Sequence, residues 1–272
     1  MGNKHKEILK LVKVRFIERA VAFVYAAIIG SLVASKGILN PIYLAYAFLI
    51  SFSIMTAIYV YNDVMDYEFD KINKVDRPIA SGSVTRREGL NLETLIVSSV
   101  LLLLGLLYST PPIRFRNRFL MVNIVRAMGG FLSCLLGGAI IGNISIQVVY
   151  QGFMFFMLIF AGAPVFDLPD LEGDKAGMSK SISILYGPKT GIKFSIVGWS
   201  AAILITALAY PYIGFNIITP IMLTSLLLIH IWLAYSLLSR WQDINYCRET
   251  CKKIIHLGLL YQLSFLLGVY YR

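Results

Sequence analysis

The sequence predicts an all-α protein, a polytopic bundle of roughly seven to nine transmembrane helices. Of its 272 residues, 57% are hydrophobic and only 15% are charged, and the mean hydropathy is +0.71. A soluble domain usually has about 25% charged residues. Since one membrane crossing takes about 20 apolar residues, the chain has room for roughly seven to nine crossings and for little else. This composition excludes a disordered protein, a disulfide scaffold and an ordinary cytosolic enzyme.

Long apolar segments, each of about the length that the hydrocarbon core requires, follow one another along the chain. They are residues 16–36, 41–62, 89–108, 119–141, 145–167, 191–210, 215–239 and 253–271. We expect each to form one helix of the bundle, within a single transmembrane domain that spans residues 1–272. The first half of that domain carries residues 62–70 and the second half carries residues 167–174, which are the two most acidic stretches of the chain.

The connections between these segments differ in charge. Residues 37–40, 142–144 and 211–216 contain no Lys or Arg. Most of the basic residues, 19 of 25, lie in five other connections, which are residues 1–15, 63–88, 109–118, 168–190 and 240–252. The positive-inside rule predicts that these five face the cytoplasm. The rule also accounts for the net charge of +10 without a nucleic-acid partner.

Segment 89–108 conflicts with this arrangement. The connections on either side of it, 63–88 and 109–118, are both basic, so an even number of crossings should separate them. The segment is long enough for one crossing only. A re-entrant hairpin shielded by protein, a helix on the membrane surface, or a local violation of the charge rule would each resolve the conflict. We favour a non-standard element at this place.

More than half of the 15 acidic residues lie in residues 62–70 and 167–174, each at the end of a long apolar segment that the charge rule places on the cytoplasmic side. Both windows have the pattern D-x-x-D-x-x-x-D. Acids in a membrane cost about 2.5 to 3.5 kcal/mol each, so they are functional by default. Solvated helix ends also carry acids, but the same spacing in two windows argues against that reading.

The spacing i, i+3, i+7 places three carboxylates on one face of a helix, where they repel one another. A hard divalent cation such as Mg²⁺ neutralises carboxylates and shares them with substrate phosphates. The two windows could therefore each hold one Mg²⁺, with a diphosphate leaving group clamped between. In the second window Pro169 is unfavourable inside a helix, so we expect a break near Asp167 and a new turn after it.

Basic residues follow each window. Arginine forks suit phosphate oxygens, and lysine acts as a point charge. We expect most of these residues to be positive-inside anchors. The candidates for binding a diphosphate are Arg77, Arg114, Lys175 and Lys180.

The motifs resemble those of the UbiA superfamily of intramembrane prenyltransferases. The resemblance lies in N-D-x-x-D-x-x-x-D at 62–70, R-P-x-x-S-G at 77–82, Y-S-x-x-P at 108–112 and D-x-x-D-x-x-G-D at 167–174. Members are helical bundles whose two aspartate motifs face a central cavity and bind Mg²⁺ with the diphosphate of a polyprenyl donor. The resemblance implies Asp63, Asp66 and Asp170 as catalytic residues. It implies these metal ligands: Asn62, Asp63, Asp66, Asp70, Asp167, Asp170 and Asp174.

The resemblance also implies Mg²⁺-dependent transfer of the polyprenyl chain to a lipophilic acceptor in the bilayer. Archaeal members that prenylate a glyceryl phosphate tend to carry Arg-Glu and Lys just before the second motif, whereas this chain has Gly162, Ala163 and Phe166. The lower positive charge favours an uncharged, aromatic acceptor of the quinone-precursor type. Prenylation of geranylgeranylglyceryl phosphate is the alternative.

Four further side chains are weaker candidates for contact with substrates. Tyr61 and Tyr108 lie in or beside the motifs, where an aromatic face stabilises a carbocation. Arg15 and Arg19 could receive an acceptor carboxylate at the entry of the first helix, but an interfacial anchor explains them equally well.

Other functions remain open. Hydrolysis or cyclisation of the same diphosphate needs the metal clamp but no acceptor. A transporter predicts acids near the midplane of several helices, which the sequence does not show. A non-catalytic membrane protein is suggested by residues 83–107, since the superfamily has two helices at this place and this chain has room for one.

Overall fold

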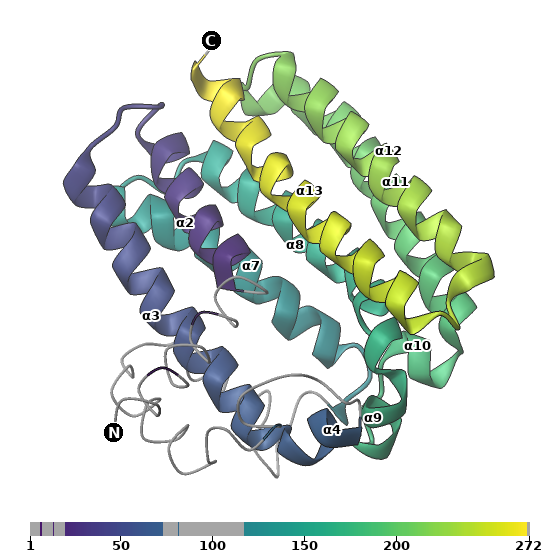
Figure 1. Cartoon of the computed structure of the whole chain (residues 1–272). Coiled ribbons are helices and arrows are strands. Elements are labelled where there is room, and N and C mark those ends of the chain that lie inside the picture. Colours follow the sequence, from purple (N-terminus) through teal and green to yellow (C-terminus); the bar gives the residue numbers. More distant parts are fainter. Residues whose placement is uncertain (1–5, 7–12, 14–19, 73–80, 82–116, 271–272) are drawn as a thin grey trace.

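The computed structural model describes residues 6, 13, 20–72, 81 and 117–270, and the regular elements in these ranges are all helices. Long helices run side by side in a bundle, with short helices at one end (Figure 1). The long helices are α2 (Val21–Ala34), α3 (Pro41–Met65), α7 (Met121–Ile141), α8 (Ile146–Phe166), α11 (Pro188–Ile213), α12 (Ile218–Arg240) and α13 (Ile244–Tyr270). The short ones are α4 (Tyr67–Ile72), the 3₁₀ turn η3 (Leu168–Asp170), α9 (Leu171–Ala176) and α10 (Ile182–Leu185).

The predicted transmembrane bundle is confirmed. Among the described residues, six helices are long and apolar enough to cross a membrane, and α2 is a shorter apolar helix. Each of these seven corresponds to a predicted segment. Segment 89–108, with the conflict over its crossings, lies outside the described residues.

Helix α13 begins earlier than predicted. The sequence analysis placed a connection over residues 240–252, but α13 starts at Ile244. Asp243 caps this start, because its Oδ1 accepts a hydrogen bond of 3.0 Å from the backbone N–H of Tyr246. Apart from Asp243, the charged residues of this stretch are therefore helical, and only residues 241–243 connect α12 to α13.

Short turns join α2 to α3, α7 to α8, and α11 to α12 at one end of the bundle (Figure 1). Helices α7 and α11 each end at a glycine in the left-handed region, Gly142 with φ 73° and Gly214 with φ 81°. Asn40 then caps α3 through a 3.0 Å bond from the N–H of Ile42, and Ser145 caps α8. These turns include the connections predicted to contain no Lys or Arg, although the turn from α2 to α3 begins earlier than predicted and also contains Lys36.

The bundle is held by close backbone contact on one side and large side chains on the other. Helices α2 and α7 approach so closely that a Cβ on Gly30 would overlap the carbonyl oxygen of Cys134, and one on Gly137 would overlap the carbonyl oxygen of Ala27. Small residues allow such packing between membrane helices. On the other side Trp199 is fully buried, and its indole N–H donates a 3.1 Å bond to the carbonyl oxygen of Leu158.

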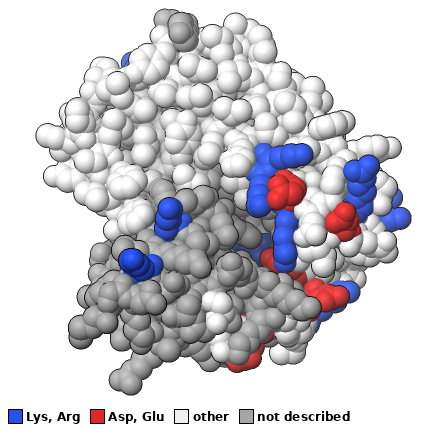
Figure 2. Space-filling view, viewed as in Figure 1, with Lys and Arg blue, Asp and Glu red and all other residues white. Residues whose placement is uncertain are grey.

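The opposite end of the bundle carries α4, η3, α9 and α10, and the turn from α12 to α13 lies at this same end (Figure 1). Helix α4 packs against α9, and η3 packs against α13. In the same view, Lys, Arg, Asp and Glu gather at this end, while most of the bundle surface above them is uncharged (Figure 2). The fold thereby brings the elements of both acidic windows together.

Candidate functional site

Each acidic motif spans a break between two helices. In the first, Asp63 lies in the last turn of α3, Asp66 follows the end of α3, and Asp70 belongs to α4. The backbone N–H of Asp66 still bonds to the carbonyl oxygen of Asn62 at 2.8 Å, but at φ −93° and ψ 5° it leaves the helix. The backbone therefore changes direction in the middle of the motif.

The second motif is divided among three elements, α8, η3 and α9. Asp167 is the C-cap of α8, Asp170 ends η3 and Asp174 lies in α9. Pro169 is in the first turn of η3, where its missing N–H costs nothing. The predicted break near Asp167 is confirmed.

The expectation of three carboxylates along one continuous helix face is wrong for the first motif, whereas the second motif is interrupted where a break was predicted. Carboxylates three and four positions apart on one helix repel. A break within each motif separates these charges. The first motif contains neither Pro nor Gly, so no residue type in it signals its break.

Three of the motif carboxylates whose side chains are described are buried. The exposed fractions are 1% for Asp63, 3% for Asp167 and 7% for Asp174. Asn62, Asp66 and Asp170 are half-buried. A carboxylate hidden from water needs a compensating charge or hydrogen bonds, because otherwise its desolvation is costly.

Arg126 of α7 supplies that compensation for Asp167. Its Nη1 atom lies 2.8 Å from Asp167 Oδ1, which makes a charge-assisted hydrogen bond and an ion pair between α7 and the end of α8. The Arg126 side chain is 30% exposed, whereas Asp167 is 3% exposed. Asp167 Oδ2 is buried, and no described residue forms a hydrogen bond with it.

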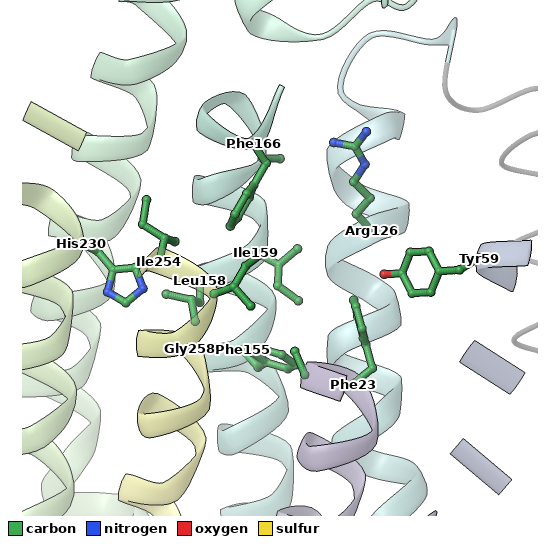
Figure 3. Close-up of a pocket in the computed structure, with 13 residues that line it drawn as sticks. Phe23, Tyr59, Arg126, Phe155, Leu158, Ile159, Phe166, His230, Ile254 and Gly258 are labelled. Carbon is green, nitrogen blue, oxygen red and sulfur yellow. The ribbon is translucent and has the colours of Figure 1, made fainter. Parts of the chain in front are cut away.

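Arg126 also lines a mostly apolar cavity (Figure 3). Arg126, Tyr59 and Phe23 lie on one side of it, and His230 and Ile254 lie on the opposite side. Tyr59 is one turn before Asp63 on α3. Residues from six helices line the cavity: Ala22, Phe23, Tyr59, Arg126, Phe155, Leu158, Ile159, Ala163, Phe166, His230, Ile254, Ile255 and Gly258.

The chemistry of the donor set fits a hard divalent cation. Carboxylate oxygens are the ligands that Mg²⁺ prefers, and the packing of α4 against α9 brings both motifs to one end of the bundle. Within the described part of the chain, no three His, Cys, Asp or Glu side chains are already gathered closely enough to hold a metal ion. The donor groups of the two motifs therefore lie at the same end of the bundle.

The candidate lysines lie close to the second motif. Lys175 is exposed on α9, and Lys180 is exposed four residues after the end of that helix. Five other candidates lie outside the described residues: Arg15, Arg19, Arg77, Tyr108 and Arg114. Tyr61 and Asp70 lie within described helices, but their side chains are not described.

Sequence reasoning missed Arg126. The signal was present, because this arginine lies inside the apolar segment 119–141, and ionisable residues within membrane segments are rare and functional. Its partner is 41 residues away in the sequence. A contact of that kind is visible only in the folded chain.

Comparison with known proteins gives consistent matches. The family model described as the UbiA prenyltransferase family matches residues 23–92 and 89–251. The chain is 26% identical over 228 residues to a digeranylgeranylglyceryl phosphate synthase of Methanosphaera stadtmanae, which covers 76% of this chain and 80% of that protein. It is 28% identical over 272 residues to the synthase of the same name from Methanobrevibacter smithii, over 90% of this chain and 92% of that one.

A solved structure has a similar fold. It is that of a UbiA homologue from Archaeoglobus fulgidus bound to GPP and Mg²⁺. The TM-score is 0.67 at 18% identity, and the match covers 96% of this chain and 99% of that one.

Proposed function

Because the chain belongs to the UbiA prenyltransferase family and is a multi-pass membrane prenyltransferase, we propose that it transfers a polyprenyl chain to a glyceryl phosphate lipid. The donor is an isoprenyl diphosphate, and the nucleophile is a hydroxyl group of the acceptor. The relatives named digeranylgeranylglyceryl phosphate synthase support this acceptor. They support it better than the aromatic acceptor that we favoured from the sequence.

One observation carries the choice of acceptor. The argument against a phosphorylated acceptor was that Gly162, Ala163 and Phe166 carry no positive charge. Arg126 lines the same cavity as Ala163 and Phe166, so a neighbouring helix brings a cation to this place. A guanidinium is well suited to phosphate oxygens, which it binds through two parallel hydrogen bonds.

The acidic end of the bundle is the proposed site of the leaving group. Asn62, Asp63, Asp66 and Asp70 would hold one Mg²⁺, and Asp167, Asp170 and Asp174 the other. Bound Mg²⁺ would supply positive charge that stabilises the departing diphosphate. Lys175 and Lys180, with Arg77 and Arg114, would contact its outer oxygens. We expect this end to face the cytoplasm, as the charge rule predicts.

The apolar cavity is the proposed site of the reacting carbon. The acceptor oxygen forms a bond to C1 of the prenyl chain, the bond from C1 to the diphosphate oxygen breaks, and the hydroxyl proton leaves with the diphosphate. Phe23, Phe155 and Phe166 keep water from the allylic cation, and aromatic faces stabilise it. Tyr59 places an aromatic ring on the side of the cavity nearest to Asp63 along α3.

The test uses purified protein in lipid nanodiscs with geranylgeranyl diphosphate and Mg²⁺. Diphosphate release and lipid products are measured with geranylgeranylglyceryl phosphate, with the same lipid lacking its phosphate, and with 4-hydroxybenzoate. Asp66→Ala and Asp170→Ala are run beside the wild type. Glu249→Ala, which removes an exposed carboxylate of α13, is the matched control.

We expect release that requires the phosphorylated acceptor, vanishes in both motif variants and persists in the control. A prenylated aromatic product instead would contradict the proposed acceptor. Release without any acceptor would identify a hydrolase or cyclase. No release, together with no Mg²⁺-dependent binding of donors of any chain length, would identify a non-catalytic protein.

A further inference from the structure

Arg126 lies between two environments that favour different partners. On one side is the buried carboxylate of Asp167, at 2.8 Å. On the other is the apolar cavity, which Arg126 lines together with Phe23 and Tyr59. The Arg126 side chain is 30% exposed and lines the cavity, whereas Asp167, at the end of α8, is 3% exposed.

Asp167 is suited to two cationic partners in turn. Its Oδ1 is bound by Arg126, while its Oδ2 is buried with no hydrogen bond from any described residue. A divalent cation on Oδ2 and the guanidinium on Oδ1 would lie within roughly 5 Å of each other, where two positive charges in a low-dielectric site repel strongly. The carboxylate therefore favours one cation over both.

We propose that Arg126 and a divalent cation compete for Asp167, and that Arg126, once displaced, binds phosphate oxygens of a substrate at the mouth of the cavity. The inference rests on the proposed function for the presence of those phosphates. Arg126 is thereby a binding residue with two alternating partners. The exchange couples filling of the metal site to the appearance of an anion-binding guanidinium in the cavity.

Exchange would pass the Asp167 carboxylate from Arg126 to the metal and free the guanidinium for the substrate in one step. Neither partner is left with an uncompensated buried charge, which would be costly.

The first experiment measures Mg²⁺ binding by calorimetry in nanodiscs, without substrate. Arg126→Gln removes the competing cation, so we expect Mg²⁺ to bind roughly tenfold more tightly than to the wild type. Lys193→Gln is the control, because it removes one exposed positive charge from α11 and leaves the pair intact. A general effect of net charge would move both variants alike.

The second experiment measures binding of geranylgeranyl thiolodiphosphate, an unreactive donor, in saturating Mg²⁺, and separately of geranylgeranylglyceryl phosphate. We expect Arg126→Gln to weaken at least one of them roughly tenfold, since a charge-assisted hydrogen bond is lost. The ligand that is weakened identifies the source of the phosphate. Arg126→Lys keeps the positive charge but lacks the planar guanidinium, so its affinity for that ligand is expected to lie between those of Arg126→Gln and the wild type.

Exchange predicts that Arg126→Gln binds Mg²⁺ more tightly and the phosphate ligand more weakly than the wild type. A merely structural Arg126 would weaken both Mg²⁺ and phosphate binding on substitution, or change neither, and either result overturns the proposal. If Arg126→Gln does not fold, Asp167→Asn provides the reciprocal test. It should lose Mg²⁺ affinity yet bind inorganic pyrophosphate without metal more tightly than the wild type, and failure to do so overturns the proposal.

These readouts do not depend on catalysis. Exchange seen with the donor analogue alone, with no turnover of the glyceryl phosphate lipid, would sustain the inference while the proposed acceptor fails. Turnover of that lipid, together with Arg126→Gln changing Mg²⁺ affinity and phosphate affinity in the same direction, would support the proposed acceptor and overturn the inference.

Discussion

The hydroxyl group of Ser183 on α10 donates a hydrogen bond of 2.8 Å to the carbonyl oxygen of Pro164 on α8. Pro164 lies three residues before Asp167, and Gly191 of α11 packs against the side chains of both Ser183 and Pro164. This contact ties the chain that follows the second motif back to the helix that precedes it.

Ser183→Ala is therefore expected to loosen the second motif. The loss of one buried hydrogen bond should lower the free energy of unfolding by about 1 kcal/mol. The KM for the donor should rise more than kcat falls, because the carboxylates are less well placed before substrate binds. Ser200→Ala is the control, since Ser200 is exposed and bonds within its own helix. An equal loss of stability in both variants would contradict the role of Ser183.

The contact between α2 and α7 predicts a severe effect at Gly137. A Cβ there would overlap the backbone carbonyl of Ala27, so Gly137→Ala must push the two helices apart. Overpacking of this kind costs about 1–3 kcal/mol. At Gly258 a Cβ would meet Leu158 at 3.8 Å, an ordinary contact, so Gly258→Ala should be tolerated. Unfolding midpoints of the two variants in detergent check the contrast, and equal midpoints would contradict it.

A larger side chain at Gly258 should affect chain-length preference. Gly258 lines the cavity, and Gly258→Leu would place its outer methyl groups in that space. If the cavity receives the prenyl chain, kcat/KM should fall roughly tenfold for geranylgeranyl diphosphate and less for geranyl diphosphate, since each lost apolar contact costs about 1 kcal/mol. Leu260→Phe on the exposed face of α13 is the control. A uniform loss for both donors would place the chain elsewhere.

The buried carboxylate of Asp63 should be required both for stabilisation by Mg²⁺ and for activity. Asp63 is 1% exposed, and Asp63→Asn removes its charge at nearly constant shape. Stabilisation by added Mg²⁺ should disappear, and diphosphate release should fall by more than roughly 100-fold. Asp243→Asn is matched to it, because asparagine caps a helix as well as aspartate does. Retained stabilisation by Mg²⁺ in Asp63→Asn would exclude Asp63 as a ligand.

Length and hydropathy were sufficient to predict the transmembrane helices, because a bilayer imposes one length on every crossing. The start of α13 was not predictable in the same way, since its first turns are polar and depend on the cap at Asp243. Pro169 predicted the break after Asp167, whereas no proline or glycine in the first motif indicates the break at Asp66.

The motifs identified the acidic residues of the candidate site but not what surrounds them. The pair of Arg126 with Asp167 joins two helices that are distant in sequence. The cavity likewise takes its lining from six helices. The ion pair and the cavity lining arise from tertiary packing, and the periodicity of a single helix does not predict which residues of other helices it will contact.

The division of each motif between a long helix and a six-residue helix has a mechanical consequence. A six-residue helix is about 9 Å long, whereas a membrane-spanning helix is restrained along its whole length. We therefore expect α4 and α9 to shift more easily than the spanning helices when a ligand binds at this end of the bundle.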